Sequence, residues 1–452
     1  MLKNFMEINI PNYIIFILDK LESSGFESYI VGGSVRDILL GKEPNDFDIA
    51  TNAKPEDIEN IFQDNKTIDI GKEFGTIKIL LDKEEVEVTT FRTEGNYLDG
   101  RRPEWVKFVP AIEDDLSRRD FTINAIAYNK KTGIVDPFNG VKDLEKKIIR
   151  SVGNPKERFK EDYLRILRAV RFSTVLDFEI EKETLKAAEE YGSNISNVSM
   201  ERINQEFFKI LLSSKPSKGI ELMREIGLLD IIVPEIIPSI GFNQQNPHHN
   251  KDVYNHILCA IDNSPPILKV RLAALFHDMG KPHTISIDEK GIGHFYGHDK
   301  VGAKIAKQAL ERMKAPHKLN EEVTILVSEH MTHHARFKDK GLKKLIRRVG
   351  VENIYDLFEL QKADRKCSNE YASIEHILDM EKRVDSILDK REAFDTNQLD
   401  INGNDLLKIG FKEGKIIGEV LEYLLEKVME NPSINKKEKL LKLAQKKYSK
   451  KS

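Results

Sequence analysis

Residues 29–51 run YIVGGSVRDILLGKEPNDFDIAT, and this stretch decides the fold of the N-terminal part of the chain. It opens on a short β-branched run that predicts a strand and leads into two glycines. Residues 35–40 have helical spacing and stop at Gly41, and the alternation over residues 46–51 predicts a second strand. Residues 11–26, ahead of the stretch, predict an amphipathic helix. This order of elements predicts a compact fold that mixes helices and strands.

Outward from this stretch, two further strands are predicted over residues 75–81 and 86–91. The polar, glycine-containing residues 92–104 predict a loop. After Asp143 almost every segment has helical periodicity. We therefore expect an α+β protein, with a small α/β head over residues 1–140 and an all-α remainder.

Composition divides the helical remainder into three segments. We expect a helical neck and body over residues 141–242, because a polar linker, NQQNPHHN, begins at Asn243. Residues 243–375 hold nearly all the histidines, and residues 376–452 predict a helical tail. The tail ends basic, with eight lysines against one glutamate in residues 436–452. Contact with RNA phosphates and a plain solvated helix both fit this basic end.

The composition excludes several classes of protein. A chain of 452 residues has room for about three domains. It buries enough surface to fold without stabilising disulfide bonds or structural metal ions. Its 71 basic against 74 acidic residues give a net charge of −3, so any nucleic-acid surface must be a local patch. Two cysteines, Cys259 and Cys367, exclude a disulfide scaffold and a Cys-rich zinc ribbon and fit a reducing cytosol. No apolar run approaches about eighteen residues and the start lacks a signal-peptide core, so we expect a cytoplasmic protein without membrane contact.

Glycines and carboxylates in the head are candidates for phosphate and metal binding. Gly32 and Gly33 let backbone N–H groups approach a phosphate, although two glycines are more often only a tight turn. Asp46 and Asp48 would share one face of a strand, as either a metal site or two solvated edge residues. Glu87, on a later strand, adds a third carboxylate. Three carboxylates can hold two Mg²⁺ ions that activate a hydroxyl and steady a triphosphate, so the combination predicts nucleotidyl transfer.

At this point the sequence resembles a known family. Residues 31–41 and 45–51 resemble the head motif of the tRNA nucleotidyltransferases, the bacterial-type CCA-adding enzymes of the polymerase-β-like superfamily. Bacterial poly(A) polymerases are close relatives of that family. The resemblance covers essentially the whole chain. It implies a polymerase-β-like head, catalytic Asp46, Asp48 and Glu87 with Mg²⁺ held there, CTP and ATP as substrates, and tRNA as partner.

Other motifs extend the resemblance. Residues 118–125 resemble the family's second motif, which holds the ribose. Together the two motifs imply these nucleotide-binding residues: Gly32, Gly33, Arg36, Arg119, Asp120 and Asn124. Residues 136–144 resemble the hinge motif that joins head to neck, and residues 92–104 resemble the flexible loop that the family needs to add the final A.

The most informative neck segment is residues 161–171, which predicts one helix with two faces. Its apolar face carries Leu164, Leu167 and Val170, and its polar face carries Asp162, Arg165 and Arg168. On an arbitrary helix such a polar face would be a surface ion-pair stripe. The resemblance implies instead that Asp162 and Arg165 imitate a template base, while Arg168 and Arg171 hold the triphosphate.

The chemistry of the bases supports this interpretation. A carboxylate accepts a hydrogen bond from the exocyclic amine of cytosine or adenine, and a guanidinium donates to the ring nitrogen beside it. Uracil and guanine place a carbonyl where the amine should be, and the carboxylate repels it. The pair therefore admits CTP and ATP and rejects UTP and GTP. Glu201, Arg202 and Glu206 are expected mainly to brace the neck helices.

Six residues in the histidine-rich segment are typical metal ligands: His256, His277, Asp278, His298, His330 and Asp364. A lone helical histidine is usually structural, but LFHDMGK at residues 275–281 joins His277 and Asp278 at the end of an apolar helix. This stretch resembles the HD phosphohydrolase signature, and the other ligands follow in matching order. Mixed imidazole and carboxylate ligands suit Mn²⁺, Fe²⁺, Ni²⁺ or Co²⁺ better than Mg²⁺ alone.

We expect four of these six residues, His256, His277, Asp278 and Asp364, to hold one metal ion. His298 and His330 would complete a second site. The remaining histidines are expected at the surface or behind the ligands: His248, His249, His283, His294, His317, His333, His334 and His376.

Three alternatives remain open. The first is an enzyme that adds only A or a poly(A) tail. The loop over residues 92–104 argues against an enzyme that adds CC without the final A, but it does not exclude this first alternative. The second is a nucleotide-hydrolysing HD enzyme. The third is an RNA-binding protein with an inactive head, against which the intact Asp46, Asp48 and Glu87 argue.

Overall fold

The computed structural model describes residues 10–81, 84–95, 105–245, 252–368 and 373–448. The chain divides into two compact units, Met1–Pro234 and Glu235–Ser452. The first unit contains the predicted head and the predicted neck and body up to Pro234, and the second contains residues 235–242, the histidine-rich segment and the tail. The four finer segments expected from the sequence remain a prediction within these two units. In the described ranges no helix combines the length and the apolar character needed to cross a bilayer.

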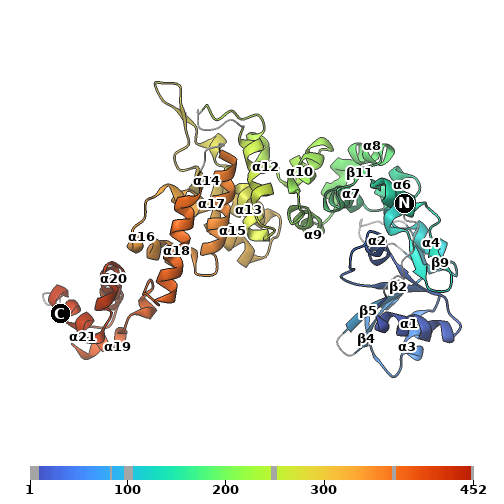
Figure 1. The fold of residues 1–452 in the computed structure, drawn as a ribbon, viewed down its shortest axis with the longest axis horizontal. Helices are drawn as coiled ribbons and strands as arrows, with labels where there is room; N and C mark the ends of the chain where they lie inside the picture. Colours follow the sequence, from blue (N-terminus) through green and yellow to red (C-terminus); the bar gives the residue numbers. More distant parts are fainter. Residues whose placement is uncertain (1–9, 82–83, 96–104, 246–251, 369–372, 449–452) are drawn as a thin grey trace. The chain divides into compact units, whose positions relative to one another are not determined.

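A mixed sheet forms the centre of the first unit, with the strand order β3-β4-β5-β2-β1-β8-β9 in the described residues (Figure 1). The strands are β1 Ser28–Val31, β2 Asp48–Thr51, β3 Lys66–Gly71, β4 Thr76–Leu81, β5 Glu84–Thr90, β8 Ala127–Asn129 and β9 Gly133–Val135. Neighbouring strands run antiparallel except β2 and β5, which are parallel. A separate hairpin pairs β6 (Arg92–Glu94) with β7 (Val106–Phe108).

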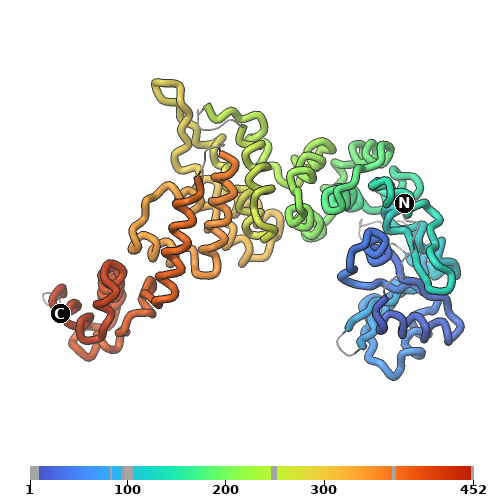
Figure 2. The backbone as a smooth tube through the Cα atoms, in the orientation of Figure 1, coloured from blue at the N-terminus to red at the C-terminus, as the bar shows by residue number. Residues whose placement is uncertain are grey.

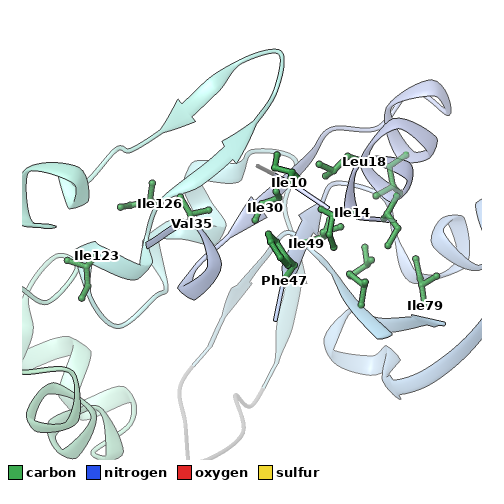
Figure 3. Close-up of a cluster of buried hydrophobic side chains, with 14 of the residues drawn as sticks. Ile10, Ile14, Leu18, Ile30, Val35, Phe47, Ile49, Ile79, Ile123 and Ile126 are labelled. Carbon is green, nitrogen blue, oxygen red and sulfur yellow. The ribbon is translucent and has the colours of Figure 1, made fainter. Parts of the chain in front are cut away.

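Alternating side chains of the sheet build a core on each face. On one face Ile30 and Ile49 join the apolar side of helix α1 (Asn12–Ser23), including Ile14 and Leu18 (Figure 3). On the other face Tyr29, Val31 and Ala50 join Phe91, Ile112 and Leu116 in a second, smaller cluster. The residues of β1 therefore divide between the two clusters with the period of two that a strand requires.

Helices surround the sheet and continue beyond it in the first unit. They are α1 Asn12–Ser23, α2 Gly33–Leu39, α3 Pro55–Ile61, α4 Ile112–Ser117, α5 Gly140–Lys146, α6 Pro155–Glu161, α7 Leu164–Leu176, α8 Lys182–Tyr191, α9 Met200–Leu211, α10 Pro216–Glu225 and α11 Leu229–Ile232. A short parallel pair, β10 Ile148–Ile149 and β11 Glu179–Ile180, interrupts them. Helix α7 buries most of its residues against α9 and α10.

The second unit is almost entirely helical (yellow to red in Figure 2). Its helices are α12 Val253–Asn263, α13 Leu268–Phe276, α14 His298–Arg312, α15 His317–Glu329, α16 Asp339–Val349, α17 Ile354–Ser368, α18 Glu375–Asp389, α19 Gly403–Lys408, α20 Lys415–Glu430 and α21 Lys437–Tyr448. Helix α13 is central, because every residue from Val270 to Phe276 is buried. The last three helices share a separate core around Leu406, Leu424 and Leu440.

Short 3-10 helices connect several of these elements. They are η1 Lys72–Phe74, η2 Thr122–Asn124, η3 Gly192–Asn197, η4 Pro234–Ser239, η5 Lys281–His283, η6 His330–His334, η7 Thr396–Gln398 and η8 Pro432–Ile434. The predicted α+β class, a mixed head followed by helices, is confirmed.

Three local predictions were wrong. Strand β2 begins at Asp48, so Asp46 precedes the strand instead of lying on it. The predicted single helix over residues 161–171 is broken, because α6 ends at Glu161 and α7 begins at Leu164. The first residues of the predicted loop 92–104 form β6, and the part of that loop from 96 to 104 lies outside the described residues.

Two further differences lie in the second unit. A small hairpin pairs β12 (Ser286–Ile287) with β13 (Gly293–His294), in the part of the chain where helical periodicity predominates. The two cysteines form a disulfide that joins α12 to α17, with their Cα atoms 5.8 Å apart. Two cysteines 108 residues apart gave no sign of this pairing, since packing of the two helices brings them together.

Candidate active site

A glycine turn connects β1 directly to α2. Gly32 has a φ of 74°, a conformation that side-chain-bearing residues rarely adopt. A Cβ atom added at Gly32 would lie only 2.8 Å from Nη1 of Arg119. Gly32 is therefore required for the backbone conformation and for the close approach of this arginine.

Three predicted carboxylates meet beside this turn. Asp48 opens β2 and lies opposite Glu87 of β5 in the parallel register. Asp46 and Asp48 both line the adjoining cavity, whereas Phe47 between them is buried. The pKa of Asp48 is raised, first because protein displaces solvent around its carboxyl and then because the negative charges of Asp46 and Glu87 lie close. The positive charge of Arg119 opposes this shift without cancelling it. A divalent cation would relieve this repulsion, so the residues fit the Mg²⁺ that the family implies.

A chain of hydrogen bonds links the second motif to the neck. Nε of Arg168 donates to Oδ2 of Asp120 over 2.7 Å, and Nδ2 of Asn124 donates to Oδ1 of the same carboxylate over 3.1 Å. Nη1 of Arg36 then donates to Oδ1 of Asn124 over 2.7 Å. Burial alone would raise the pKa of Asp120, but Arg168 and the Asn124 hydrogen bond outweigh it and lower the pKa to about 2.

Asp162 and Arg165 lie at the break between α6 and α7, and both are buried. Oδ1 of Asp162 accepts from the backbone N–H of Leu164 over 3.0 Å, so this carboxylate fixes the turn that leads into helix α7, whose N-cap is Tyr163. Its Oδ2 lies 2.7 Å from Nη2 of Arg202. Arg165 bonds to Glu161 and does not pair with Asp162 in this conformation.

Six residues beyond Arg165 on α7, Arg171 pairs with Glu206 of α9. Its guanidinium also lies 3.8 Å from the ring centroid of Phe172. Burial lowers the pKa of Arg171, and the charge of Glu206 opposes that shift. Glu206 therefore braces the helix, as expected, by holding an arginine at the cavity wall.

These residues enclose one cavity of about 590 Å³. Its lining residues are Gly32, Gly33, Arg36, Asp46, Asp48, Arg92, Arg118, Arg119, Asp120, Asn124, Asp162, Leu164, Arg165, Arg168, Arg171, Phe172 and Arg202. Of the residues predicted for the head and neck site, only Glu87 is outside this lining, and it borders the cavity through its pairing with Asp48. Eight arginines in one cavity fit a polyphosphate ligand.

The sequence interpretation missed part of the lining. Arg202 was expected mainly to brace the neck, yet it also lines the cavity and pairs with Asp162. Arg118 also lines the cavity, and its partner Asp115 is almost fully buried. The adjacent arginines at 118 and 119 were a usable signal for Arg118, whereas the 40 residues between Asp162 and Arg202 left none for Arg202.

A second cluster lies in the other unit, where α12 and the end of α13 meet α17. Nε2 of His256 lies 3.2 Å from Nε2 of His277 and 3.0 Å from Oδ1 of Asp364. Nδ1 of His277 faces the carbonyl of Ala274 at 2.8 Å, and a carbonyl only accepts, so the ring proton belongs on Nδ1. The Nε2 lone pair of His277 therefore points toward its neighbours.

The second pair of histidines repeats this arrangement. Nε2 of His298 lies 3.2 Å from Nε2 of His330, and their Nδ1 atoms face the carbonyls of Phe295 and Val327 at 2.7 Å each. Asp278 belongs to both groups, one with His256 and His277 and one with His298 and His330, and all of these residues are buried. Facing lone pairs repel unless a cation lies between them, so the donor set fits metal ions. All six predicted ligands are brought together.

A cavity of about 440 Å³ opens onto this cluster. Its lining includes Asp278, Lys281, Phe295, His298, Asp364 and Arg365. Three of the histidines left unassigned by the sequence, His294, His333 and His334, also line it. His248 and His249 lie outside the described residues.

Family models match three parts of the chain. The poly A polymerase head domain matches residues 28–150, a probable RNA-binding site of polymerase A matches residues 177–240, and a putative second domain of tRNA nucleotidyltransferase matches residues 297–444. With the mixed sheet and the arginine-lined cavity, these matches define the class: a tRNA nucleotidyltransferase with a polymerase-β-like head, as predicted.

Comparison with individual proteins narrows the class to a family. A CCA-adding enzyme of Ligilactobacillus salivarius is 34% identical over 433 residues, 95% of each chain. One from Pediococcus pentosaceus is 53% identical over 207 residues, which are 46% of this chain and 52% of that protein. The crystal structure of the Bacillus stearothermophilus CCA-adding enzyme in complex with CTP superposes with a TM-score of 0.73 at 27% identity, covering 96% of this chain and 97% of that one. The chain belongs to the CCA-adding enzyme family.

Proposed function

We propose that this protein adds CCA to the 3′ end of tRNA with CTP and ATP and releases pyrophosphate. The observation that carries the proposal is that one cavity contains Asp46 and Asp48 together with Asp162, Arg165 and a set of arginines. The first group serves phosphoryl transfer and the second serves base selection. A relative of this fold was solved in complex with CTP, which supports the choice of ligand.

In this proposal the 3′-oxygen of the tRNA bonds to the α-phosphorus of the incoming nucleotide, and the bond to pyrophosphate breaks. Asp46, Asp48 and Glu87 would hold Mg²⁺, which supplies Lewis-acid stabilisation of the attacking and leaving oxygens. Arg168 and Arg171 bind the triphosphate. The pairing of Asp120 with Arg168 keeps that arginine at the cavity wall.

Base selection is assigned to Asp162 and Arg165. Both side chains are buried, and both already have protein partners, Arg202 and Glu161. A cytosine or adenine edge would therefore join or replace these contacts instead of filling an empty pocket. We infer that Arg202 holds the carboxylate of Asp162 oriented for the exocyclic amine of the base.

Substitution of Asp48 tests the transferase site. Asp48→Asn keeps the size of the side chain but removes a charge from the carboxylate group, so nucleotide addition should fall at least about a hundredfold while tRNA binding persists. Asp64→Asn, at an exposed head position, is the matched control and should behave as the native chain. Near-native addition by the Asp48 variant would remove the metal assignment.

The alternative of adding only A, or a poly(A) tail, depends on residues 92–104, most of which lie outside the described ranges. We therefore keep CCA addition as the proposal and treat these activities as outcomes of the extension assay described at the end of the Discussion. Because tRNA is the proposed substrate, we also place the activity in the cytoplasm. Helix α21, rich in lysine, is proposed to contact tRNA phosphates.

A second activity is favoured by the facing Nε2 atoms of the histidine–aspartate cluster. We propose a phosphohydrolase that cleaves 2′,3′-cyclic or terminal phosphates, such as damaged tRNA ends carry. Water oxygen would bond to phosphorus, one ring P–O bond would break, and the freed ribose oxygen would take a proton. His256, His277, Asp278 and Asp364, with His298 and His330, would hold Mn²⁺, Ni²⁺, Co²⁺ or Fe²⁺, which supplies Lewis-acid activation there.

Asp278 tests this second activity because it belongs to both ligand groups. Asp278→Asn should abolish hydrolysis of 2′,3′-cyclic AMP and lower the content of bound metal measured by mass spectrometry. Addition of CTP and ATP to tRNA should remain. Asp379→Ala, at an exposed position of α18, is the control. Native protein that binds no transition metal and hydrolyses no phosphoester would remove the proposal.

A further inference from the structure

Two buried polar atoms beside the histidine–aspartate cluster have no hydrogen-bond partner in the described part of the chain. His333 is only 2% exposed and lines the cavity. Its Nδ1 faces the carbonyl of His330 at 2.8 Å, so the ring proton belongs on Nδ1 and Nε2 is an acceptor. Among the described residues, no donor reaches this Nε2. A buried acceptor without a donor is costly, which indicates a ligand that supplies one.

Arg365 provides the second such atom. Within the described residues, its Nε is buried without a hydrogen-bond partner and its guanidinium has no ion pair. It follows Asp364 on α17 and lines the same cavity as His333. A guanidinium left without a carboxylate at a cavity wall is suited to a phosphate, which accepts its planar set of donors.

An exposed aromatic surface stands at the same cavity. Tyr296 is 79% exposed, the most of any large hydrophobic residue in the described ranges. Its ring stacks on the ring of His294, with an interplanar angle of 8° and centroids 5.6 Å apart. This contact holds one face of the Tyr296 ring. The Nζ of Lys281 lies 5.5 Å from the ring centroid of the neighbouring, half-buried Phe295. A held aromatic ring with a free face is the usual platform for a nucleobase.

We propose that this cavity binds the 3′-terminal nucleotide of an RNA, with Arg365 on the phosphate, His333 on a ribose hydroxyl and Tyr296 on the base. The assignment rests on the phosphohydrolase proposed above and specifies its substrate class. One cavity of about 440 Å³ is lined by a hydrogen-bond donor for a phosphate, an acceptor for a hydroxyl and a stacking surface for a base. These three features match the three parts of a nucleotide. A simple phosphoester would leave His333 and Tyr296 without a role.

Binding can be measured without metal or catalysis. The chain has one tryptophan, Trp105 in the head, so Trp105→Phe with Tyr296→Trp leaves a single indole at the cavity. Chelator-treated protein of this kind should lose fluorescence when 2′-AMP is added. Adding Arg365→Ala should weaken the affinity for 2′-AMP about 10- to 100-fold, and Arg365→Lys should restore part of it.

His333→Ala should weaken binding of 2′-AMP but not of its 3′-deoxy analogue. Absence of quenching, or an Arg365→Ala titration equal to the parent, overturns the proposal.

Kinetic measurements distinguish this nucleotide-binding proposal from the phosphohydrolase proposal on which it rests. With metal-loaded protein, Tyr296→Ala should raise KM for 2′,3′-cyclic AMP about 5- to 100-fold with little change in kcat. KM for a base-free methyl riboside 2′,3′-cyclic phosphate, and the metal content, should stay constant. If native protein hydrolyses the cyclic nucleotide and these variants match it, nucleotide recognition by these residues is wrong while the phosphohydrolase stands. If the reporter binds 2′-AMP but nothing is hydrolysed, the phosphohydrolase is wrong and the binding site stands.

Discussion

Asp162 shows how much of the proposed chemistry depends on one side chain. Its Oδ1 accepts from the backbone N–H of Leu164 in the turn before helix α7, its Oδ2 pairs with Arg202, and the carboxylate still lines the nucleotide cavity. The same group therefore has a structural and a selective role. Substitution separates these roles, because the helix start affects stability and the base contact affects discrimination.

We expect Asp162→Ala to relax base choice more than it weakens tRNA binding. The lost carboxylate is the group that repels the carbonyls of UTP and GTP, so discrimination against them should fall by about 1–3 kcal/mol. The measurement is the rate of incorporation of each of the four nucleotides into tRNA. Glu157→Ala on the exposed side of α6 is the control. Complete exclusion of UTP and GTP by the Asp162 variant would contradict base selection by this residue.

The pair of Asp120 and Arg168 predicts a pH dependence of stability. The folded pKa of Asp120, about 2, lies below its ordinary value of 3.8, so the pair stabilises the fold fully above that ordinary value. This contribution, about 2 kcal/mol, should disappear as pH falls from about 4 to 2. In urea unfolding, native protein should exceed Asp120→Asn by a constant free energy between pH 5 and 8, and the difference should shrink below pH 4. A difference that grows toward low pH would reverse the assigned sign.

At the scale of elements, the turn between β1 and α2 positions both the backbone and Arg119. Gly32→Ala should lower the free energy of unfolding by about 1–2 kcal/mol because φ is positive, and it should also reduce nucleotide addition by displacing Arg119. Gly133→Ala is a matched control, since Gly133 has the same φ of 74° but open space around its Cα. The two variants should lose similar stability, and only Gly32→Ala should lose activity. Equal activity in both would contradict the role given to the close approach of Arg119.

The elements also show what sequence can predict. The spacing of Gly32, Asp46 and Asp48 predicted the core of the head, because strand and turn preferences are local. The break at Asp162 was missed, since apolar periodicity continued through it while the carboxylate bonded the N–H of Leu164. Arg202 and the Cys259–Cys367 disulfide were missed because each depends on contacts between helices distant in sequence. The six metal-ligand candidates were found through a motif resemblance, and only folding could bring their side chains together.

At the scale of the whole molecule, the two proposed activities belong to different compact units. Nucleotide and transition metal should therefore stabilise different parts of the chain. In scanning calorimetry we expect CTP with Mg²⁺ to raise the midpoint of one unfolding transition and Mn²⁺ or Ni²⁺ to raise that of another. Asp278→Asn should abolish the second shift and leave the first. One transition that responds equally to both ligands in the native and variant proteins would contradict independent sites.

The central claim is template-independent addition of CCA, and a single extension assay tests it most directly. Purified protein is given a tRNA that lacks its 3′-terminal CCA, with Mg²⁺ and each nucleotide alone or in combination, and the products are sized and sequenced. We predict two cytidines with CTP alone, the complete CCA with CTP and ATP, and no extension with UTP or GTP. Extension only of a tRNA that already ends in CC, growth of an adenosine tail, or no extension of any tRNA would contradict this account.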